Sequence, residues 1–325
     1  MSAETAVLRW PGRLGVLARL APAYLRHLTL RPFRHDLADA PVPADARRSV
    51  RHSAAALDAW FGQVLGTYAR LAGIQLRRES GPLAMRYVRL AAALNQEFEH
   101  RLATGQPLDF ADLCAAPLVA ARVAEWRCFT LTHTAAPAVV EFLSSDDATD
   151  DYDRYVAVTT RDGFAADPEL QMESIRLDSG GYLARLVWLV GRFNNRSTAP
   201  DLLQQFHDLG IAAKLTDELT DLATDHAEGR YNLLLALLGQ EPGELAAVLR
   251  RLNGALPMPL AWWRESAPLA FARFTALYGE YHGRLQSPEL RRACDATMLR
   301  ALGGPKHQRR GPNRHVSEPP HEAWR

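Results

Sequence analysis

The sequence predicts an all-α protein, and three observations lead to that prediction. Apolar residues recur at three- and four-residue spacing through most of the middle of the chain, which is the period of a helix with one buried face. Proline and glycine mark many of the breaks between these stretches. Strand signals are poor, since only residues 152–160 could be extended and they stand alone. The segments expected to be helical are 53–76, 82–104, 109–126, 168–193, 199–227, 231–238, 242–253 and 266–283.

The composition is that of an ordinary globular protein. The chain has 325 residues, of which 47% are hydrophobic and 23% charged, so it can bury a substantial core and is not disordered, collagen-like or a coiled coil. Its three cysteines lack the paired spacing of a metal site and are too few for a disulfide scaffold, which favours a reduced, cytoplasmic setting. The net charge of +1 argues against a nucleic-acid partner. No apolar stretch reaches the roughly 18 residues that a membrane span requires.

Charge divides the chain into three regions. Residues 1–51 carry nine arginines against four acidic residues and form a basic amphipathic arm. Two interpretations of the arm stay open: it packs across the main body, or it makes a peripheral contact with a membrane surface or a partner. Residues 52–303 form the helical domain, and the polar basic tail at 304–325 is expected to be disordered. The acidic residues concentrate in the helical domain, which is therefore where chemistry is expected.

The first helices are separated by clear breaks. Gly81-Pro82 opens the second predicted helix, and Gly105-Gln106-Pro107 ends it. Ser144 and Ser145, which indicate a loop or a helix cap, then precede a literal Asp-Asp-x-x-Asp run within 146–151. This run lies only 71 residues before Asp217, the first of three evenly spaced aspartates, so we expect a solvated acidic loop there. The alternative is that it closes over a metal site.

The second half begins with a helical stretch that contains Ser179-Gly180-Gly181. Each glycine inside a helix costs about 1 kcal/mol relative to alanine, so this triplet indicates either a break within a helix or a loop between two helices. Pro200 opens the next helix. Later breaks are marked by Gly239, Pro242, Gly254 and Pro257-Met258-Pro259.

Three aspartates dominate the helix at 199–227. Asp217, Asp221 and Asp225 follow one another at four-residue steps, each about 40° from the last around the helix, so they share one face. Like charges at this spacing repel each other, and oxygen ligands of this kind suit Mg²⁺. A plain solvated acidic stripe is the alternative. Gly229 is expected to end the helix, and Arg230 and Lys214 are placed to bind a phosphate group near these carboxylates.

The run LTDELTDLATDHAEGRYNL at 215–233 resembles the second aspartate-rich motif of squalene and phytoene synthases. Leu215-Thr216-Asp217, the aspartates at 221 and 225, and Gly229-Arg230 fill corresponding places, whereas Thr224 stands where that family has glutamate. The run also resembles the second acidic helix of tetraprenyl-β-curcumene synthase-like enzymes. Both groups belong to the class I isoprenoid (terpenoid) synthases. The clear likeness covers about 25 residues, and a looser one extends from Ser179 to about Leu238.

The resemblance implies a single helical bundle around a deep central cavity, with Mg²⁺, three ions in number, gripping a linear prenyl diphosphate. A first acidic motif should then lie near residues 80–110. No Asp-Asp-x-x-Asp occurs there, but Asn95 and Glu99, with Gln96 beside them, share a helix face and can serve as metal ligands. The alternative for Asn95 and Glu99 is an ordinary exposed face.

The resemblance also implies further substrate-binding residues. Arginines would approach the diphosphate, backbone carbonyls at the glycine break would face the reacting cation, and aromatic rings would stabilise it by cation–π attraction. Surface salt bridges and plain core packing are the alternatives. The candidates for substrate contact, besides Lys214, are Arg176, Arg192, Gly180, Gly181, Tyr182, Trp188, Phe98, Phe206 and Tyr231.

The function that the resemblance implies is that of a magnesium-dependent terpene synthase. Such an enzyme ionises and cyclises a linear prenyl diphosphate and releases diphosphate. Two alternatives stay open: head-to-head joining of two prenyl diphosphates, as in squalene and phytoene synthases, and a non-catalytic prenyl-lipid-binding or partner protein of the same fold. A homodimer is a further expectation, because dimers are common in this fold.

Overall fold

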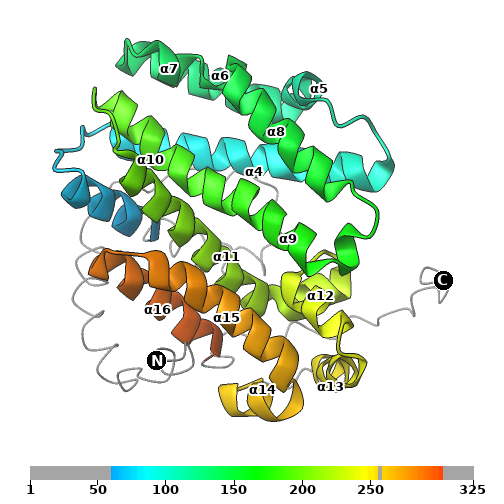
Figure 1. Cartoon of the computed structure of the whole chain (residues 1–325). Helices are drawn as coiled ribbons and strands as arrows, with labels where there is room; N and C mark the ends of the chain where they lie inside the picture. The colour runs from blue at the N-terminus through cyan, green and yellow to red at the C-terminus, as the bar shows by residue number, and fades with distance from the viewer. Residues whose placement is uncertain (1–59, 255–257, 303–325) are drawn as a thin grey trace, which may run out of the picture.

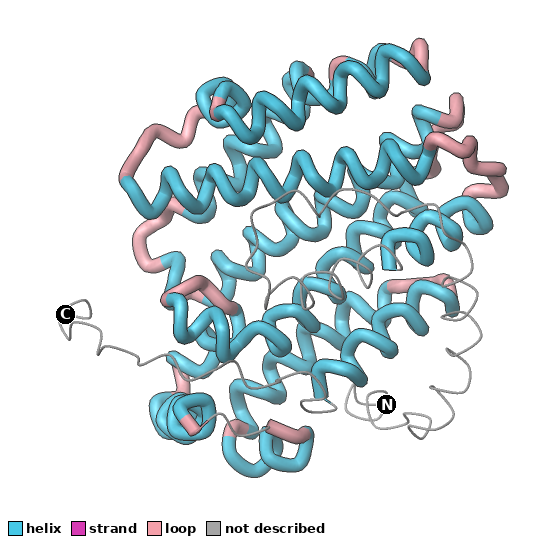
Figure 2. The backbone as a smooth tube through the Cα atoms, turned by 180° about the vertical axis from the view of Figure 1, so that it is seen from behind, coloured by secondary structure: helices cyan, strands magenta, loops and turns pink. Residues whose placement is uncertain are grey.

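The computed structural model describes residues 60–254 and 258–302, so the predicted arm at 1–51 and tail at 304–325 lie outside the described residues. Within those two ranges every regular element is a helix and none is a strand, which confirms the all-α prediction (Figure 2). A helix at 60–71 comes first. The helices that follow are α4 (Ser80–Thr104), α5 (Phe110–Ala115), α6 (Pro117–His133), α7 (Pro137–Val140), α8 (Asp146–Thr159), α9 (Pro168–Ile175), α10 (Gly181–Phe193), α11 (Pro200–Glu228), α12 (Leu233–Gly239), α13 (Pro242–Asn253), α14 (Leu260–Ser266), α15 (Pro268–Arg284) and α16 (Pro288–Leu302). Short 3-10 turns lie at Phe142–Ser144 and Phe164–Ala166.

The helices form one bundle in which α11 is central. It packs against α10 on one side and against α15 and α16 on the other (Figure 1). Beyond α10 lie α4 and then α6, while α8 lies along α9. The short helices α12, α13 and α14 gather at one end of the bundle (Figure 1).

The 29-residue helix α11 owes its position to a long apolar face. Phe206, Leu215 and Leu222 are all at most 1% exposed and pack into the main core. Pro200 occupies the first turn, where its missing N–H costs nothing. Gly229 follows the last residue with φ 67°, a left-handed conformation that glycine adopts without strain. Both predicted ends of this helix are therefore confirmed.

The predicted break at Ser179-Gly180-Gly181 is a π-helical turn, η3 (Arg176–Gly180), which joins α9 to α10 without a loop. Close packing explains the glycines here. A Cβ atom built on Gly210 of α11 would lie 2.2 Å from the Ser179 carbonyl oxygen, and one on Gly180 would lie 2.7 Å from His207 Nε2. Two missing side chains thus let the π turn and α11 approach each other closely.

The expectations for residues 144–160 were wrong in two respects. Residues 152–159 are not extended, and the acidic run at 146–151 is not a loop; both belong to α8, and Thr160 is its C-cap. Ser145 is the N-cap, and its hydroxyl accepts a hydrogen bond from the Ala148 N–H. Asp146 and Asp147 occupy the first turn, where the helix dipole favours negative charge. The N-cap and the favourable charges in the first turn stabilise a helix here, although the β-branched residues that follow are typical of strands.

Two C-terminal helices were not predicted from the sequence. Helix α14 lies between the proline-rich break and α15, and α16 follows α15. The start of α16 has a clear local cause, because the Ser287 hydroxyl accepts hydrogen bonds from the N–H groups of Glu289 and Leu290.

Candidate active site

The three aspartates of α11 lie on one face, as predicted, but in different surroundings. The Asp217 side chain is 55% exposed and Asp221 is also exposed, whereas Asp225 is only 8% exposed. Partial burial, together with the carboxylates of Asp217 and Asp225, raises the pKa of Asp221 to about 6. The acidic face therefore holds negative charges that repel one another and would be stabilised by a cation.

Asp225 is engaged by the chain that follows α11. Asn232 Nδ2 donates hydrogen bonds to Asp225 Oδ2 and to the Glu218 carbonyl oxygen, both at 2.8 Å. The Leu233 N–H donates to Glu218 Oε2 at 2.6 Å. The chain turns back after Gly229, and these two carboxylates satisfy the donors at the start of α12. Asp225 thus holds the α11–α12 connection, a role that the spacing of the aspartates did not indicate.

Lys214 extends onto the acidic face from one turn earlier in α11. Its Nζ lies 2.8 Å from Glu218 Oε1 and 3.5 Å from Asp217 Oδ2. Burial alone would lower the pKa of Lys214, but the carboxylates of Glu218 and Asp217 raise it above its usual value. The ammonium group is therefore charged and held among carboxylates.

The metal ligands predicted for the first acidic motif, Asn95 and Glu99, lie on helix α4. Asn95 Nδ2 donates a hydrogen bond to Glu99 Oε1 at 2.9 Å, and both side chains are exposed. The shared face of these two residues, four positions apart, is thereby confirmed. Their role as metal ligands stays a prediction.

Two residues that the sequence did not single out connect α4 to α11. Asp178 of η3 interacts electrostatically with both Lys214 and Glu99, and Tyr155 of α8 interacts with Asp178, Glu99 and Lys214. The Asp178 side chain is exposed, and the protein atoms packed near it partly desolvate the carboxylate and raise its pKa. The available signal was the position of Asp178 immediately before the predicted glycine break. Groups from α4, α8, η3 and α11 thus converge on one place.

The predicted arginines are engaged elsewhere. Arg176 Nε donates a hydrogen bond to the Tyr281 hydroxyl of α15 at 2.7 Å. The Arg192 guanidinium lies 5.6 Å from the centre of the Trp188 ring. Arg230 is exposed and paired with Glu228. Arg176 of the π turn, Arg192 of α10 and Arg230 after α11 therefore each have a protein partner.

The predicted aromatic residues do not line one common space. Phe206 is fully buried and packs edge-on against Tyr68 in the core. Tyr182 stacks on Tyr87 with ring centres 5.0 Å apart. Tyr231 is 49% exposed and contacts Phe164.

Phe98 is the exception, because it lies beneath the converging charges. It is 4% exposed, and its ring centre is 5.1 Å from that of Tyr155. Phe98 therefore places an apolar surface directly behind the Tyr155 phenol.

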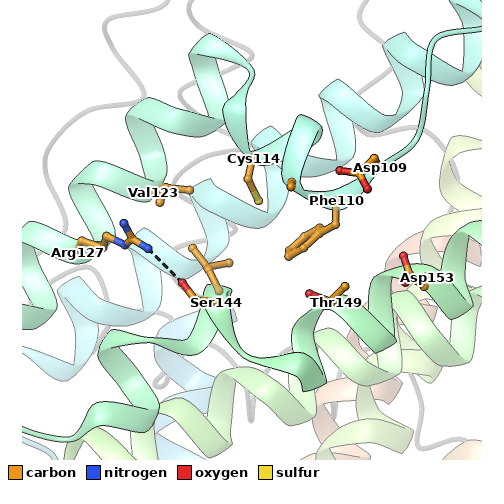
Figure 3. A pocket seen from close by; sticks show the side chains of 10 residues that line it. Asp109, Phe110, Cys114, Val123, Arg127, Ser144, Thr149 and Asp153 are labelled. Carbon is orange, nitrogen blue, oxygen red and sulfur yellow. Dashed lines mark hydrogen bonds between the residues drawn. The ribbon is translucent and has the colours of Figure 1, made fainter.

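Two pockets are lined by other residues than those of this site. One of about 370 Å³ is formed by α5, α6, α8 and the turn before α8, with Arg127 toward one end and Asp109 and Asp153 toward the other (Figure 3). Another of about 260 Å³ lies beside Asp208 and Arg284. Neither is lined by a predicted site residue. The deep central cavity stays a prediction.

The possible metal donors among the groups of α4, α8, η3 and α11 described above are carboxylates. Residues 60–254 and 258–302 contain no group of three or more His, Cys, Asp or Glu side chains arranged around a metal position. Asp217 and Asp221 lie close together, and Asp178 interacts electrostatically with Glu99. Mg²⁺ is commonly bound by one or two carboxylates, with water and substrate phosphates completing its octahedron. Asp217 and Asp221 are donors of the kind that Mg²⁺ binds in this way, and a bound Mg²⁺ stays a prediction.

Comparisons with known proteins found no family model, no curated protein and no solved structure that matches this chain. Within the described ranges, none of the helices combines the length and apolar character needed to cross a membrane.

Proposed function

We propose that the protein is a magnesium-dependent class I isoprenoid synthase that ionises and cyclises a linear prenyl diphosphate. One observation supports the proposal: Asp178 and Tyr155 each interact electrostatically with Glu99 of α4 and with Lys214 of α11. A site of this class needs two acidic faces on opposite helices. The glycine break that the resemblance implies takes the form of the turn η3, which packs against α11.

The carboxylate pairs Asp217–Asp221 and Asp178–Glu99 would hold Mg²⁺. Bound Mg²⁺ neutralises the charge that develops on the departing diphosphate. Repulsion between Asp217 and Asp221 favours a bound cation; partial burial raises the pKa of Asp221 most, and that repulsion raises it further. The predicted number of three ions stays part of the proposal.

Two other groups of the site bind and orient the leaving group. The Lys214 ammonium remains charged and can donate to a phosphate oxygen. Burial raises the pKa of the Tyr155 phenol, and Asp178 and Glu99 raise it further. The phenol therefore keeps its proton and can donate a hydrogen bond to an anion. Behind it, the buried Phe98 ring packs against Tyr155, and the contact of Phe98 with a carbocation that the resemblance implies stays part of the proposal.

The test is turnover of defined substrates by the purified full chain. Geranyl, farnesyl and geranylgeranyl diphosphate are supplied separately with MgCl₂, and released pyrophosphate and extracted hydrocarbons are measured. We expect Mg²⁺-dependent release with a cyclic product of unchanged carbon number. A product of doubled carbon number would instead establish head-to-head condensation. No release from folded protein with any of the three would overturn the proposal in favour of a non-catalytic protein.

A pair of variants ties the activity to the site. Asp221→Ala removes a proposed ligand and should lower pyrophosphate release by about 100-fold or more. Glu173→Ala removes an exposed carboxylate of the neighbouring helix α9 and should leave the rate unchanged. Equal rates in the two variants would mean that the acidic face is not the site of reaction.

A further inference from the structure

The pocket formed by α5, α6 and α8 carries opposite charges at its two ends. Its volume of about 370 Å³ lies in the lower part of the range of about 300–1,000 Å³ that is usual for small-molecule sites. Arg127 of α6 lies toward one end, and Asp109 and Asp153 lie toward the other (Figure 3). A molecule that spans this pocket would therefore meet a guanidinium at one end and two carboxylates at the other.

The rest of the pocket wall is largely apolar. Phe110 of α5, Val123 of α6 and Leu143 of the 3-10 turn line it, and Thr149 adds a hydroxyl group. Cys114 also lines it, and burial raises the pKa of its thiol, so this group stays neutral at physiological pH. A wall of this kind favours hydrocarbon over charge in the middle of a bound molecule.

Local hydrogen bonds hold the charged groups in place before any molecule binds. Arg127 Nη2 donates to the Ser144 hydroxyl at 3.1 Å, and a guanidinium has five N–H donors in all (Figure 3). Asp109 is the N-cap of α5, where its Oδ1 accepts the Asp112 N–H at 3.0 Å. Groups that are already positioned bind a ligand with a smaller loss of conformational entropy.

Ion pairing within the protein leaves the charges of this pocket unbalanced. In the part of the chain that the structure describes, neither Asp109 nor Asp153 forms an ion pair, although both residues are exposed. Arg101 of α4 reaches α5 at the Asp112 carbonyl oxygen, but its ion pair is with Glu97. The two carboxylates at this end can therefore accept hydrogen bonds from an ammonium group.

We propose that this pocket binds a small zwitterion, a molecule with an anionic group at one end, an ammonium group at the other and a short apolar chain between them. Arg127 would bind the anionic group, and Asp109 and Asp153 would bind the ammonium group. An ω-amino carboxylic acid has this pattern of charge. None of the residues of the proposed prenyl diphosphate site lines the pocket, so the inference does not depend on the proposed function.

Calorimetric titration of the full-length protein tests the proposal. The probes are the ω-amino derivatives of butanoic, hexanoic and octanoic acid, each compared with the plain carboxylic acid and the plain amine of the same chain length. The plain compounds can use only one end of the pocket. We expect at least one amino acid to bind at least ten-fold more tightly than both of its plain counterparts. If none of the three does so, the proposal is overturned.

Variants at the two ends separate the contributions of the charges. Arg127→Gln should weaken binding of the best amino acid at least ten-fold, and so should Asp109→Asn/Asp153→Asn, in which asparagine keeps the N-cap of α5. Arg122→Gln is the matched control, because Arg122 lies on α6 but is paired with Glu125 and does not line the pocket. A control that loses as much affinity as Arg127→Gln would contradict the assignment.

Two cysteines report where the amino acid binds. Cys114 lines the pocket, whereas Cys128 is exposed on α6 and is not part of the lining. A saturating amino acid should slow alkylation of Cys114 by iodoacetamide at least five-fold and leave the rate at Cys128 unchanged, as measured by mass spectrometry of peptides. Binding that leaves the Cys114 rate unchanged, or slows both cysteines equally, would mean that the amino acid does not occupy this pocket.

Discussion

Replacing Asp221 by asparagine should stabilise the protein at neutral pH. Partial burial and the carboxylates of Asp217 and Asp225 raise the pKa of Asp221 from its ordinary 3.8 to about 6. Taken at face value this corresponds to about 3 kcal/mol, but Asp221 is exposed, and solvent screening reduces the effect to about 1 kcal/mol. Because the pKa is raised on folding, the favourable contribution of the protonated group is complete below pH 4 and is lost as the pH rises through 6.

The assay is thermal unfolding of the wild type and Asp221→Asn between pH 4 and 8, in EDTA. The two proteins should unfold at the same temperature near pH 4, and Asp221→Asn should unfold about 2–4 °C higher at pH 7.5. Glu173→Gln is the matched control and should follow the wild type at every pH. Adding MgCl₂ at pH 7.5 should raise the unfolding temperature of the wild type more than that of Asp221→Asn. A lower unfolding temperature for Asp221→Asn at pH 7.5 would refute the reasoning.

Two further predictions concern the packing around α11, and each is measured by chemical denaturation. Gly210→Ala should lower the free energy of unfolding by about 3 kcal/mol, because its Cβ would meet the Ser179 carbonyl oxygen at 2.2 Å. Gly229→Ala, at a left-handed position with open space around it, should cost only about 1 kcal/mol, and equal losses would contradict the close approach. Asn232→Ala should cost about 3 kcal/mol, since it removes the α12 cap and leaves the buried Asp225 carboxylate unpaired. A loss below 1 kcal/mol would show that Asp225 does not depend on Asn232.

Local sequence signals were sufficient for α4 and α11, the two longest of the described helices, but not for α8 or α16. The apolar period and the flanking Pro200 and Gly229 defined both ends of α11, and the four-residue spacing defined the faces of its aspartates and of Asn95 and Glu99. These features depend on interactions within one helix, so they can be predicted from the sequence alone.

Features that depend on contacts between helices could not be predicted from the sequence alone. Asp178 joins the site because the π turn is held against Gly210, thirty positions further along the chain. Asp225 is drawn away from the open face because Asn232 binds it after the chain reverses. Arg176 has suitable charge, but the same packing directs it to Tyr281 of α15. In each case the residue type and spacing indicated a charged side chain on a helix, but the group that it contacts lies elsewhere in the chain and could not be identified from the local sequence.

The central claim is that the carboxylates of α4 and α11 act in one magnesium-dependent site. Its most direct test is pyrophosphate release from farnesyl diphosphate by the wild type, Glu99→Gln and Asp217→Asn, each with and without Mg²⁺. The wild type should release pyrophosphate only with Mg²⁺, and both variants should be slower by about 100-fold or more. A Glu99→Gln variant as fast as the wild type would show that α4 takes no part in the site, and a wild type inactive with Mg²⁺ would contradict the account as a whole.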